Sequence, residues 1–286
     1  MTPRGRLLYF RVPESTGPIT KAQTPDGQWL RCDGCGEILY RKTLESNHFI
    51  CTRCGHHFRI PPEQYINILL DDGRLEEVDT DLATGDPLKF PQYREKLKKA
   101  QASTGRTDGF SYGRAAISSI PVVFGVMDFR FIGGSMNAVV GEKVARAARL
   151  AREEKLPLVL ISTSGGARMH EGIFSLMQMA KTSAELGLLR KAGLPFVSIP
   201  VDPCTAGVMA SFASLGDVIL SEPGALLGFT GARVIKDTIG EELPDGFQRS
   251  EFLLKHGLID KVVPRRDLKE TVAGLLALLT GQEDDE

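Results

Sequence analysis

The distribution of hydrophobic and polar residues divides the chain at about residue 111. Beyond it, short continuous apolar runs, typical of buried strands, alternate with longer segments whose apolar residues recur every three or four positions, as on one face of a helix. The predicted strands are residues 121–129, 156–162, 194–201, 217–221 and 225–229, and the predicted helices are residues 137–154, 167–191 and 204–215.

In the first three units, strand and helix alternate about every 35 residues, which is typical of stacked α/β units. We therefore predict the α/β class. The pattern leaves open whether the units form a doubly wound sheet or a spiral of β-β-α turns. In the longest predicted helix, the apolar residues that share one face, and are expected to pack on the core, are Met169, Ile173, Leu176, Ala180 and Ala184.

The N-terminal part of the chain has a different texture. Four prolines in residues 1–27 predict an irregular arm, and a polar stretch further on contains predicted helices at residues 61–70 and 93–103. The predicted domains are an irregular arm (1–27), a cysteine-containing module (28–58), a helical linker region (59–110) and the α/β domain (111–286).

Composition is ordinary for a globular protein, with 42% hydrophobic and 25% charged residues among 286. No apolar run approaches the roughly 20 residues that span a bilayer, and no signal peptide is visible, so we expect a cytoplasmic protein without membrane contact. Residues 1–60 carry nine Lys/Arg and five Asp/Glu, whereas the remainder carries 26 and 31. This mild basic excess leaves RNA binding by the N-terminal module open.

Four cysteines form two close pairs, Cys32 with Cys35 and Cys51 with Cys54, separated by fifteen residues. This spacing is typical of a zinc ribbon in which four thiolates hold one zinc ion. Because four protein ligands leave no position for a substrate, we expect the Zn²⁺ to be structural. Two disulfides are the alternative, which is disfavoured because only one further cysteine, Cys204, is present and nothing indicates secretion.

Two predicted strand-to-helix junctions contain adjacent glycines, Gly133-Gly134 and Gly165-Gly166. Amide N–H groups in such a turn can face a ligand, unobstructed by side chains and with the dipole of the following helix behind them. They can therefore stabilise a developing oxyanion or an enolate. Turns that only pack the helix against the strand are the other interpretation. Arg168, beside the second pair, can hold a phosphate or pair within the protein.

Motifs for several other chemistries are absent from the sequence. There is no Walker-type phosphate loop, and therefore no ATP site, no dinucleotide-binding glycine pattern and no nucleophile elbow. No lysine has the sequence context of a biotin attachment site. His170 can face a ligand from the helix after Gly166, but a surface or packed histidine is expected. Cys204 is expected to be a small packing residue, because no base is visible for it.

Seven motifs in order along the chain, together with the cysteine module, resemble the β subunit of bacterial acetyl-CoA carboxylase carboxyltransferase. The likeness runs from about residue 28 to residue 280. The motifs are FIGGSM at 131–136, VGEK at 140–143, SGGARM at 164–169, QMAKT at 178–182, ASFA at 210–213, GFTGARVI at 228–235 and GFQRSEFL at 246–253.

This resemblance implies a crotonase-like β-β-α spiral core with a small N-terminal four-cysteine zinc ribbon. It also implies transfer of the carboxyl group of carboxybiotin, held by a separate biotin carboxyl carrier protein, to acetyl-CoA. The product is malonyl-CoA, the first committed intermediate of fatty acid synthesis. The family works as an α2β2 assembly with a carboxyltransferase α subunit and is served by biotin carboxylase. The active site is shared between α and β.

The resemblance also implies roles for individual residues. The α subunit is expected to supply a second oxyanion hole, and Arg168 and Arg233 are expected to contact CoA. Two positions depart from the family pattern: Asn137 stands where glycine is expected, and Ala206 replaces one of two adjacent glycines, where its Cβ can narrow the turn. The amides expected to hold the enolate are those of Gly133, Gly134, Gly165 and Gly166.

Three rival functions stay open at this stage. One is an mRNA-binding zinc-ribbon protein, and another is a carboxyltransferase or decarboxylase for propionyl-CoA or a different acyl-CoA. The third, a crotonase-type hydratase, requires a carboxylate pair near the glycines. Glu142 and Glu171 are the nearby candidates, and both fit exposed helix positions.

The zinc ribbon generates a first prediction. Zinc contributes about 10–16 kcal/mol of apparent binding free energy to small thiolate modules, so the ribbon should fold only with metal. We expect Cys32→Ser to disorder residues 28–58 while the α/β core stays folded, as measured by amide hydrogen exchange and circular dichroism. A globally unfolded variant would contradict this prediction.

Overall fold

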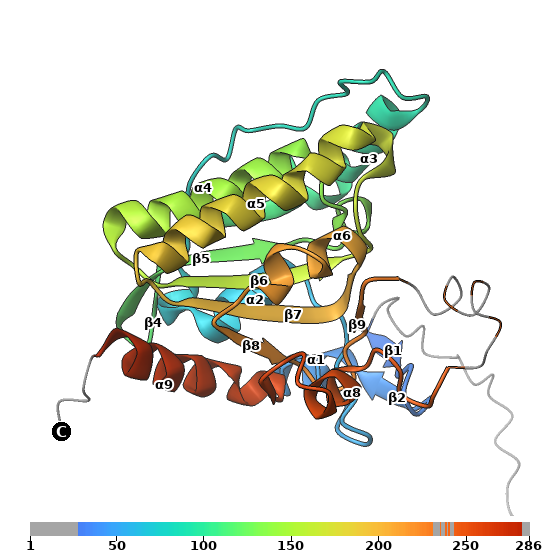
Figure 1. The fold of residues 1–286 in the computed structure, drawn as a ribbon. Coiled ribbons are helices and arrows are strands. Elements are labelled where there is room, and N and C mark those ends of the chain that lie inside the picture. Colours follow the sequence, from blue (N-terminus) through green and yellow to red (C-terminus); the bar gives the residue numbers. More distant parts are fainter. Residues whose placement is uncertain (1–27, 231–234, 236–237, 239, 241–242, 282–286) are drawn as a thin grey trace, which may run out of the picture.

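The computed structural model describes residues 28–281, except 231–234, 236–237, 239 and 241–242. Its centre is a sheet with the strand order β10-β8-β7-β6-β5-β4-β3, in which β9 also pairs with β7 (Figure 1). Strands β5 to β8 and β10 are parallel, whereas β4 and β3 are antiparallel additions at one edge. The strands are β3 (Glu76–Glu77), β4 (Phe110–Ile117), β5 (Ile120–Met127), β6 (Leu158–Ser164), β7 (Phe196–Thr205), β8 (Val218–Ser221), β9 (Leu227–Gly228) and β10 (Lys261–Val262).

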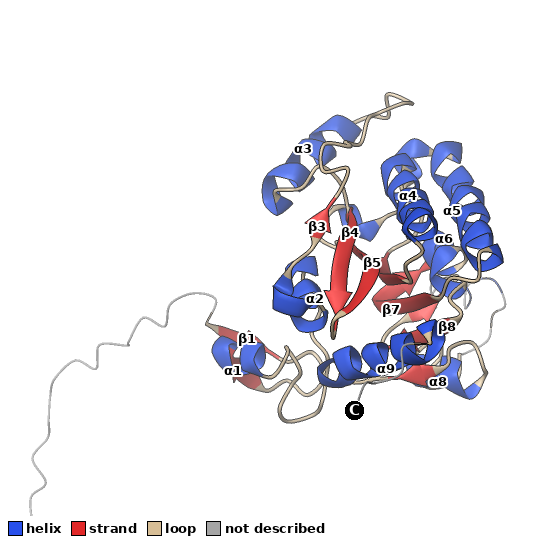
Figure 2. Ribbon diagram, turned by 90° about the vertical axis from the view of Figure 1, so that its left-hand side faces the viewer, coloured by secondary structure: helices blue, strands red, loops and turns tan. Residues whose placement is uncertain are grey.

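Helices cover both faces of this sheet. Helices α4 and α5 pack on one face, and α2 and α9 pack on the other (Figures 1 and 2). In β5, Val123 faces the first layer while Val122 and Phe124 face the second, which explains why the strand reads as one continuous apolar run. The helices of this domain are α2 (Pro62–Leu69), α3 (Tyr93–Thr104), α4 (Ala138–Glu154), α5 (Ile173–Lys191), α6 (Ala206–Met209), α8 (Ser250–Lys255) and α9 (Leu268–Thr280).

The predicted α/β class is confirmed, and the strands predicted at 121–129, 156–162 and 194–201 correspond to β5, β6 and β7. The helix predicted over residues 204–215 is wrong, because β7 continues to Thr205 and only the four residues of α6 are α-helical before a 3₁₀ turn. Strand β4 and helix α9 were not predicted. No helix in the described part of the chain is long and apolar enough to cross a membrane.

The predicted inward face of α5 is also wrong. Met169 precedes the helix and is 81% exposed, and Ile173 and Leu176 on the helix point outward as well. The helix begins at Ile173 because Gly172, with a φ of +50°, interrupts the chain. The buried positions of α5 are Ser175, Gln178, Thr182, Leu186 and Leu189.

Close packing between α4 and α5 explains this inversion. A Cβ atom at Gly141 of α4 would lie 2.4 Å from the Cβ of Gln178, so only glycine fits at this crossing. The buried polar side chains of α5 bond to backbone carbonyls: Gln178 Nε2 donates to Phe174 O at 2.9 Å, and Thr182 Oγ1 donates to Gln178 O at 3.0 Å. Each side chain thus has a backbone acceptor for its donor group, whereas the buried Gln178 Oε1 has no hydrogen-bond partner among the described residues.

The N-terminal module contains a two-stranded sheet of β1 (Trp29–Arg31) and β2 (Ile38–Tyr40), followed by α1 (Arg41–Ser46). It has a small apolar cluster of its own around Leu44 and lies beside the main domain (Figure 2). Residues 59–110 are integrated into the main domain, because Tyr65 and Leu69 of α2 share a buried cluster with α9 and β3 joins the main sheet. The predicted domain boundaries themselves stay a prediction.

The helix crossing generates a matched pair of predictions. Gly141→Ala should lower the free energy of unfolding by about 1–3 kcal/mol, because the new methyl group overlaps Gln178. Gly187→Ala, in the neighbouring α5 with nothing within 4 Å, should raise it by about 0.5–1 kcal/mol. Urea unfolding monitored by circular dichroism measures both, and shifts of the same sign would contradict the packing argument.

Candidate functional site

Three turns converge at one edge of the sheet, where the parallel strands β5, β6 and β7 end. The turn after β5 contains Gly133 and Gly134, the turn after β6 contains Gly165 and Gly166, and β7 leads directly into Ala206 at the start of α6. Since the carboxyl ends of parallel strands meet at the same edge, the fold brings together glycines that are far apart in the sequence.

These turns touch each other through their backbones. The amide of Gly165 donates to Gly133 O at 2.8 Å, and a Cβ at Gly134 would lie 2.3 Å from Thr163 O. A Cβ at Gly166, whose φ is +121°, would lie 2.8 Å from the Cβ of Ala206. Gly134 and Gly166 are therefore required by close approach as well as by backbone conformation.

Most of the predicted oxyanion-hole amides have an acceptor within the chain. Gly134 N donates to Phe131 O at 3.1 Å, Gly165 N donates to Gly133 O, and Gly166 N donates to Ser164 Oγ at 2.9 Å. Gly133 is the one predicted donor whose N–H has no acceptor among the described residues, and a Cβ placed there meets nothing within 4 Å.

Two further amides at this edge were not predicted. Ala167 N has no acceptor in the described part of the chain, although both neighbouring residues take part in the bridge with Met136. Gly207 lies in the first turn of α6, where amides have no intrahelical acceptor. A Cβ at Gly207 would lie 3.5 Å from the Cβ of Ala167, so the two residues are neighbours. The sequence signals for this pair are the SGGARM motif, which contains Ala167, and the turn at Ala206, which precedes Gly207.

The two departures from the family pattern have structural explanations. Asn137 is the N-cap of α4, where its Oδ1 accepts from Val140 N at 2.8 Å, a position for which asparagine is preferred. Ala206 adopts a φ of +51°, a left-handed conformation that disfavours alanine by about 1–2 kcal/mol, and its Cβ fills the space beside Gly166.

Arg168 is buried and serves the scaffold. Its Nε donates to Ser135 Oγ at 2.7 Å, its Nη2 to Ser135 O at 2.6 Å, and its Nη1 to Tyr93 OH at 3.2 Å. These bonds tie the turn after β6 to the turn after β5, and the guanidinium is only 1% exposed. Arg168 was expected either to hold a phosphate or to pair within the protein, and its geometry supports internal pairing. Arg233, the other predicted CoA contact, lies outside the described residues.

The carboxylates near the glycines are both engaged. Glu171 was expected to be exposed, which is wrong: it is buried, Oε1 accepts from Tyr93 OH at 2.6 Å and Oε2 accepts from Ala138 N at 2.8 Å. Burial, together with this hydrogen bond, raises the pKa of Tyr93, so its hydroxyl stays protonated and donates. Glu142 pairs with Arg146 and Lys181. Among the described residues, the site has no free carboxylate pair for a hydratase.

Two other residues have the packing roles that we predicted. His170 stacks on Tyr93 with ring centroids 4.7 Å apart. Cys204 lies inside β7, and burial raises the pKa of its thiol, which disfavours the thiolate that a nucleophile needs.

The four ribbon cysteines bring their sulfur atoms together in one cluster. All four Sγ atoms lie within 4.8 Å of one another, with 3.6 Å between Cys32 and Cys54 and 3.9 Å between Cys35 and Cys51. Zn–S bonds of about 2.3 Å require sulfur separations of about 3.8 Å in a tetrahedron, so the donor set fits one zinc ion. The two knuckles match: Gly36 N donates to Cys32 O and Gly55 N donates to Cys51 O, each glycine with a φ near +75°.

Comparison with known proteins defines the class. The carboxyl transferase domain model matches residues 70–248, and the acetyl-CoA carboxylase zinc finger model matches residues 29–54. The structure of transcarboxylase 12S with bound methylmalonyl-coenzyme A aligns with a TM-score of 0.67 and 26% identity over 83% of this chain and 44% of that chain. The chain is thus a carboxyl transferase with a crotonase-like α/β core and a zinc ribbon, as predicted.

Curated relatives define the family more closely. The acetyl-coenzyme A carboxylase carboxyl transferase subunit beta of Desulforamulus reducens is 53% identical over 93% of this chain and 92% of its own. A longer relative from Natranaerobius thermophilus is named acetyl-coenzyme A carboxylase carboxyl transferase subunits beta/alpha. It is 47% identical over 96% of this chain and 45% of its own length. The chain belongs to the family of acetyl-CoA carboxylase carboxyl transferase β subunits.

Proposed function

We propose that this chain is the β half of a carboxyltransferase that moves the carboxyl group of carboxybiotin to acetyl-CoA, forming malonyl-CoA. The observation that carries the chemistry is the group of free amide N–H groups where the three turns converge, those of Gly133, Ala167 and Gly207. The acetyl-CoA specificity rests on the identity of about half of the residues with the relatives that carry this name.

The reaction needs what such amides provide. Removing a proton from the methyl group of a thioester places negative charge on the carbonyl oxygen, and preorganised N–H donors stabilise that enolate. Losing one such donor typically raises the barrier by about 3–4 kcal/mol. Biotin, when bound, supplies the carboxyl group and then the base. This requirement fits a site in which Glu142, Glu171 and Cys204 are all unavailable as a base or nucleophile.

We infer that a carboxyltransferase α subunit completes the site. An exposed apolar surface begins immediately after Arg168, beside the glycine turns. Leu88 belongs to the same surface, because a Cβ atom placed on Gly172 would lie 3.2 Å from Leu88 Cδ1. The relative in which β and α form one chain supports this occupant. This surface, called the α5 surface below, consists of Leu88, Met169, Ile173, Phe174, Leu176 and Met177.

The remaining partners follow from the same proposal. A biotin carboxyl carrier protein delivers the carboxyl group and biotin carboxylase charges it, in the cytoplasm, and Arg233 stays a proposed CoA contact. RNA binding is less well supported, because Arg41, Arg53 and Arg59 of the ribbon region each pair with a carboxylate of the chain. Another acyl-CoA as substrate is supported only by the lower likeness to transcarboxylase.

The reverse reaction tests the proposed function. Malonyl-CoA-dependent carboxylation of free biocytin should appear when this chain is mixed with an α subunit and should be absent with either chain alone. Methylmalonyl-CoA should react at least tenfold more slowly. A stable complex without activity on malonyl-CoA would overturn acetyl-CoA as the substrate.

The α5 surface generates a separate prediction. Ile173→Asp and Leu176→Asp should weaken α-subunit binding at least tenfold, because each buries an unpaired charge in the complex. Their thermal stability should stay unchanged, since both side chains are exposed in the free chain. Leu278→Asp, at a still more exposed position on α9 at the opposite face of the sheet, is the control. Unchanged affinity in sedimentation or calorimetry would place the α subunit elsewhere.

A further inference from the structure

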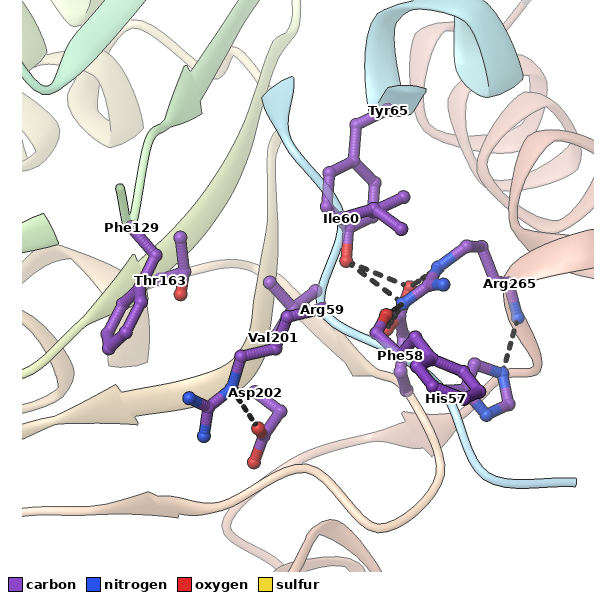
Figure 3. Close-up of a pocket in the computed structure, with 11 residues that line it drawn as sticks. His57, Phe58, Arg59, Ile60, Tyr65, Phe129, Thr163, Val201, Asp202 and Arg265 are labelled. Atoms are coloured by element: carbon purple, nitrogen blue, oxygen red, sulfur yellow. Dashed lines mark hydrogen bonds and ion pairs between the residues drawn. The ribbon is translucent and has the colours of Figure 1, made fainter. Parts of the chain in front are cut away.

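Arg59, the residue that directly follows the zinc ribbon, contacts the edge of the sheet that carries the glycine turns (Figure 3). Its Nε donates to Asp202 Oδ2 at 2.8 Å, and its guanidinium lies over the ring of Phe129, 5.1 Å from the centroid. Phe129 follows β5 and Asp202 lies near the end of β7. One side chain therefore bridges the two strands on either side of β6.

Asp202 also bonds to the segment before β9, which in turn bonds to the end of β7. Its Oδ1 accepts from Leu226 N at 2.9 Å, and Cys204 N donates to Leu226 O at 2.9 Å. From β6, Thr163 Oγ1 donates to Pro203 O at 3.0 Å. The segment that leads into Gly207 is thus held by β6, by β9 and by Arg59.

A buried arginine from the C-terminal part of the chain holds the ribbon in place. Arg265, in the 3₁₀ turn before α9, is 1% exposed and forms a bidentate pair with Glu222 at 2.7 and 2.6 Å. Its Nη1 donates to His48 O at 3.0 Å and its Nη2 to Phe58 O at 2.9 Å. A planar guanidinium can make all of these bonds at once, whereas an ammonium cannot.

Two further contacts complete the docking. His57 Nδ1 lies 3.0 Å from Gly55 O, which places the ring proton on Nδ1 and leaves Nε2 to accept from Arg265 N at 3.2 Å. The Arg265 guanidinium lies over the ring of Tyr65, with its central carbon 5.4 Å from the ring centroid. The space left between these groups and Arg59 is a cavity of about 20 Å³ (Figure 3), and a larger cavity of about 720 Å³ lies beside it, between the ribbon and the segment around Leu226.

We propose that Arg59 is a positioning residue of the carboxyl-transfer site, held against Phe129 and Asp202 by the docking of the zinc ribbon on the buried Arg265–Glu222 pair. This inference rests on the proposed function. Arg59 touches no reacting atom. It sets the separation of the ends of β5 and β7, and hence of the amides of Gly133 and Gly207. Displacements of about 1 Å at such a site can slow a reaction by about 100-fold.

Arg59→Gln, in the complex with the α subunit, is the central test. The Arg59 side chain is 56% exposed, so losing the ion pair should leave the thermal midpoint unchanged. We expect kcat for malonyl-CoA and biocytin to fall about fivefold to tenfold with KM unchanged, because the interaction acts on the transition state. Arg59→Lys, which keeps an ion pair with Asp202, should retain more activity than Arg59→Gln.

Arg265→Lys tests the docking step. Hydrogen exchange of the ribbon amides at 48–58 should accelerate at least tenfold while zinc content stays at one ion per chain, and kcat should fall as far as in Arg59→Gln. Arg59→Gln should leave this exchange unchanged. Arg266→Lys, a neighbouring arginine that is 60% exposed, is the matched control for both measurements.

Each outcome decides a separate point. Unchanged kcat in Arg59→Gln overturns the positioning role, and a rise in KM alone makes Arg59 a substrate contact instead. Unchanged ribbon exchange in Arg265→Lys overturns the docking. An inactive wild-type complex overturns the proposed function, and the exchange comparison then still tests whether Arg265 docks the ribbon.

Discussion

The close approach of three backbone turns at one edge of the sheet is the constraint on which the rest of this structure depends. Side chains at Gly134 or Gly166 would overlap Thr163 O or the Cβ of Ala206, so the turns meet through their main chains. Many of their amides then bond to one another, and the buried guanidinium of Arg168 ties the turns together. Only the few N–H groups left over by this scaffold are available to a substrate.

Helices α4 and α5 also approach each other closely, and this packing determines which side of α5 is left for a partner subunit. Since Gly141 allows the helices to meet, α5 turns its polar Ser175, Gln178 and Thr182 inward, where each donates to a backbone carbonyl. Its larger apolar residues consequently remain on the outside, next to the turns. An apolar surface beside an incomplete site is typical of a subunit interface, which makes the α subunit part of the structural argument as well as of the family relationship.

The zinc ribbon depends on two kinds of interaction: the four thiolates are close together in the sequence, whereas its contact with the main domain is long-range. Its four thiolates and two matching knuckles are close in sequence, and we predict that a metal ion orders them. Its placement depends on Arg265, more than 200 residues away, which satisfies two ribbon carbonyls while paired with Glu222. The ribbon is thereby docked next to the strands that end at the candidate site.

The sequence by itself determined the α/β class, the ribbon and its ligands, the three central strands and the glycine turns, because each is a local pattern of periodicity, spacing or residue type. It did not determine which face of α5 is buried, that Glu171 and Arg168 lie inside, or which glycine amides stay free. Periodicity shows that a helix has an apolar face but not whether the core or a partner covers it. The acceptor of the Gly165 amide is Gly133 O, which belongs to a different turn, so only the tertiary structure decides which donors remain for chemistry.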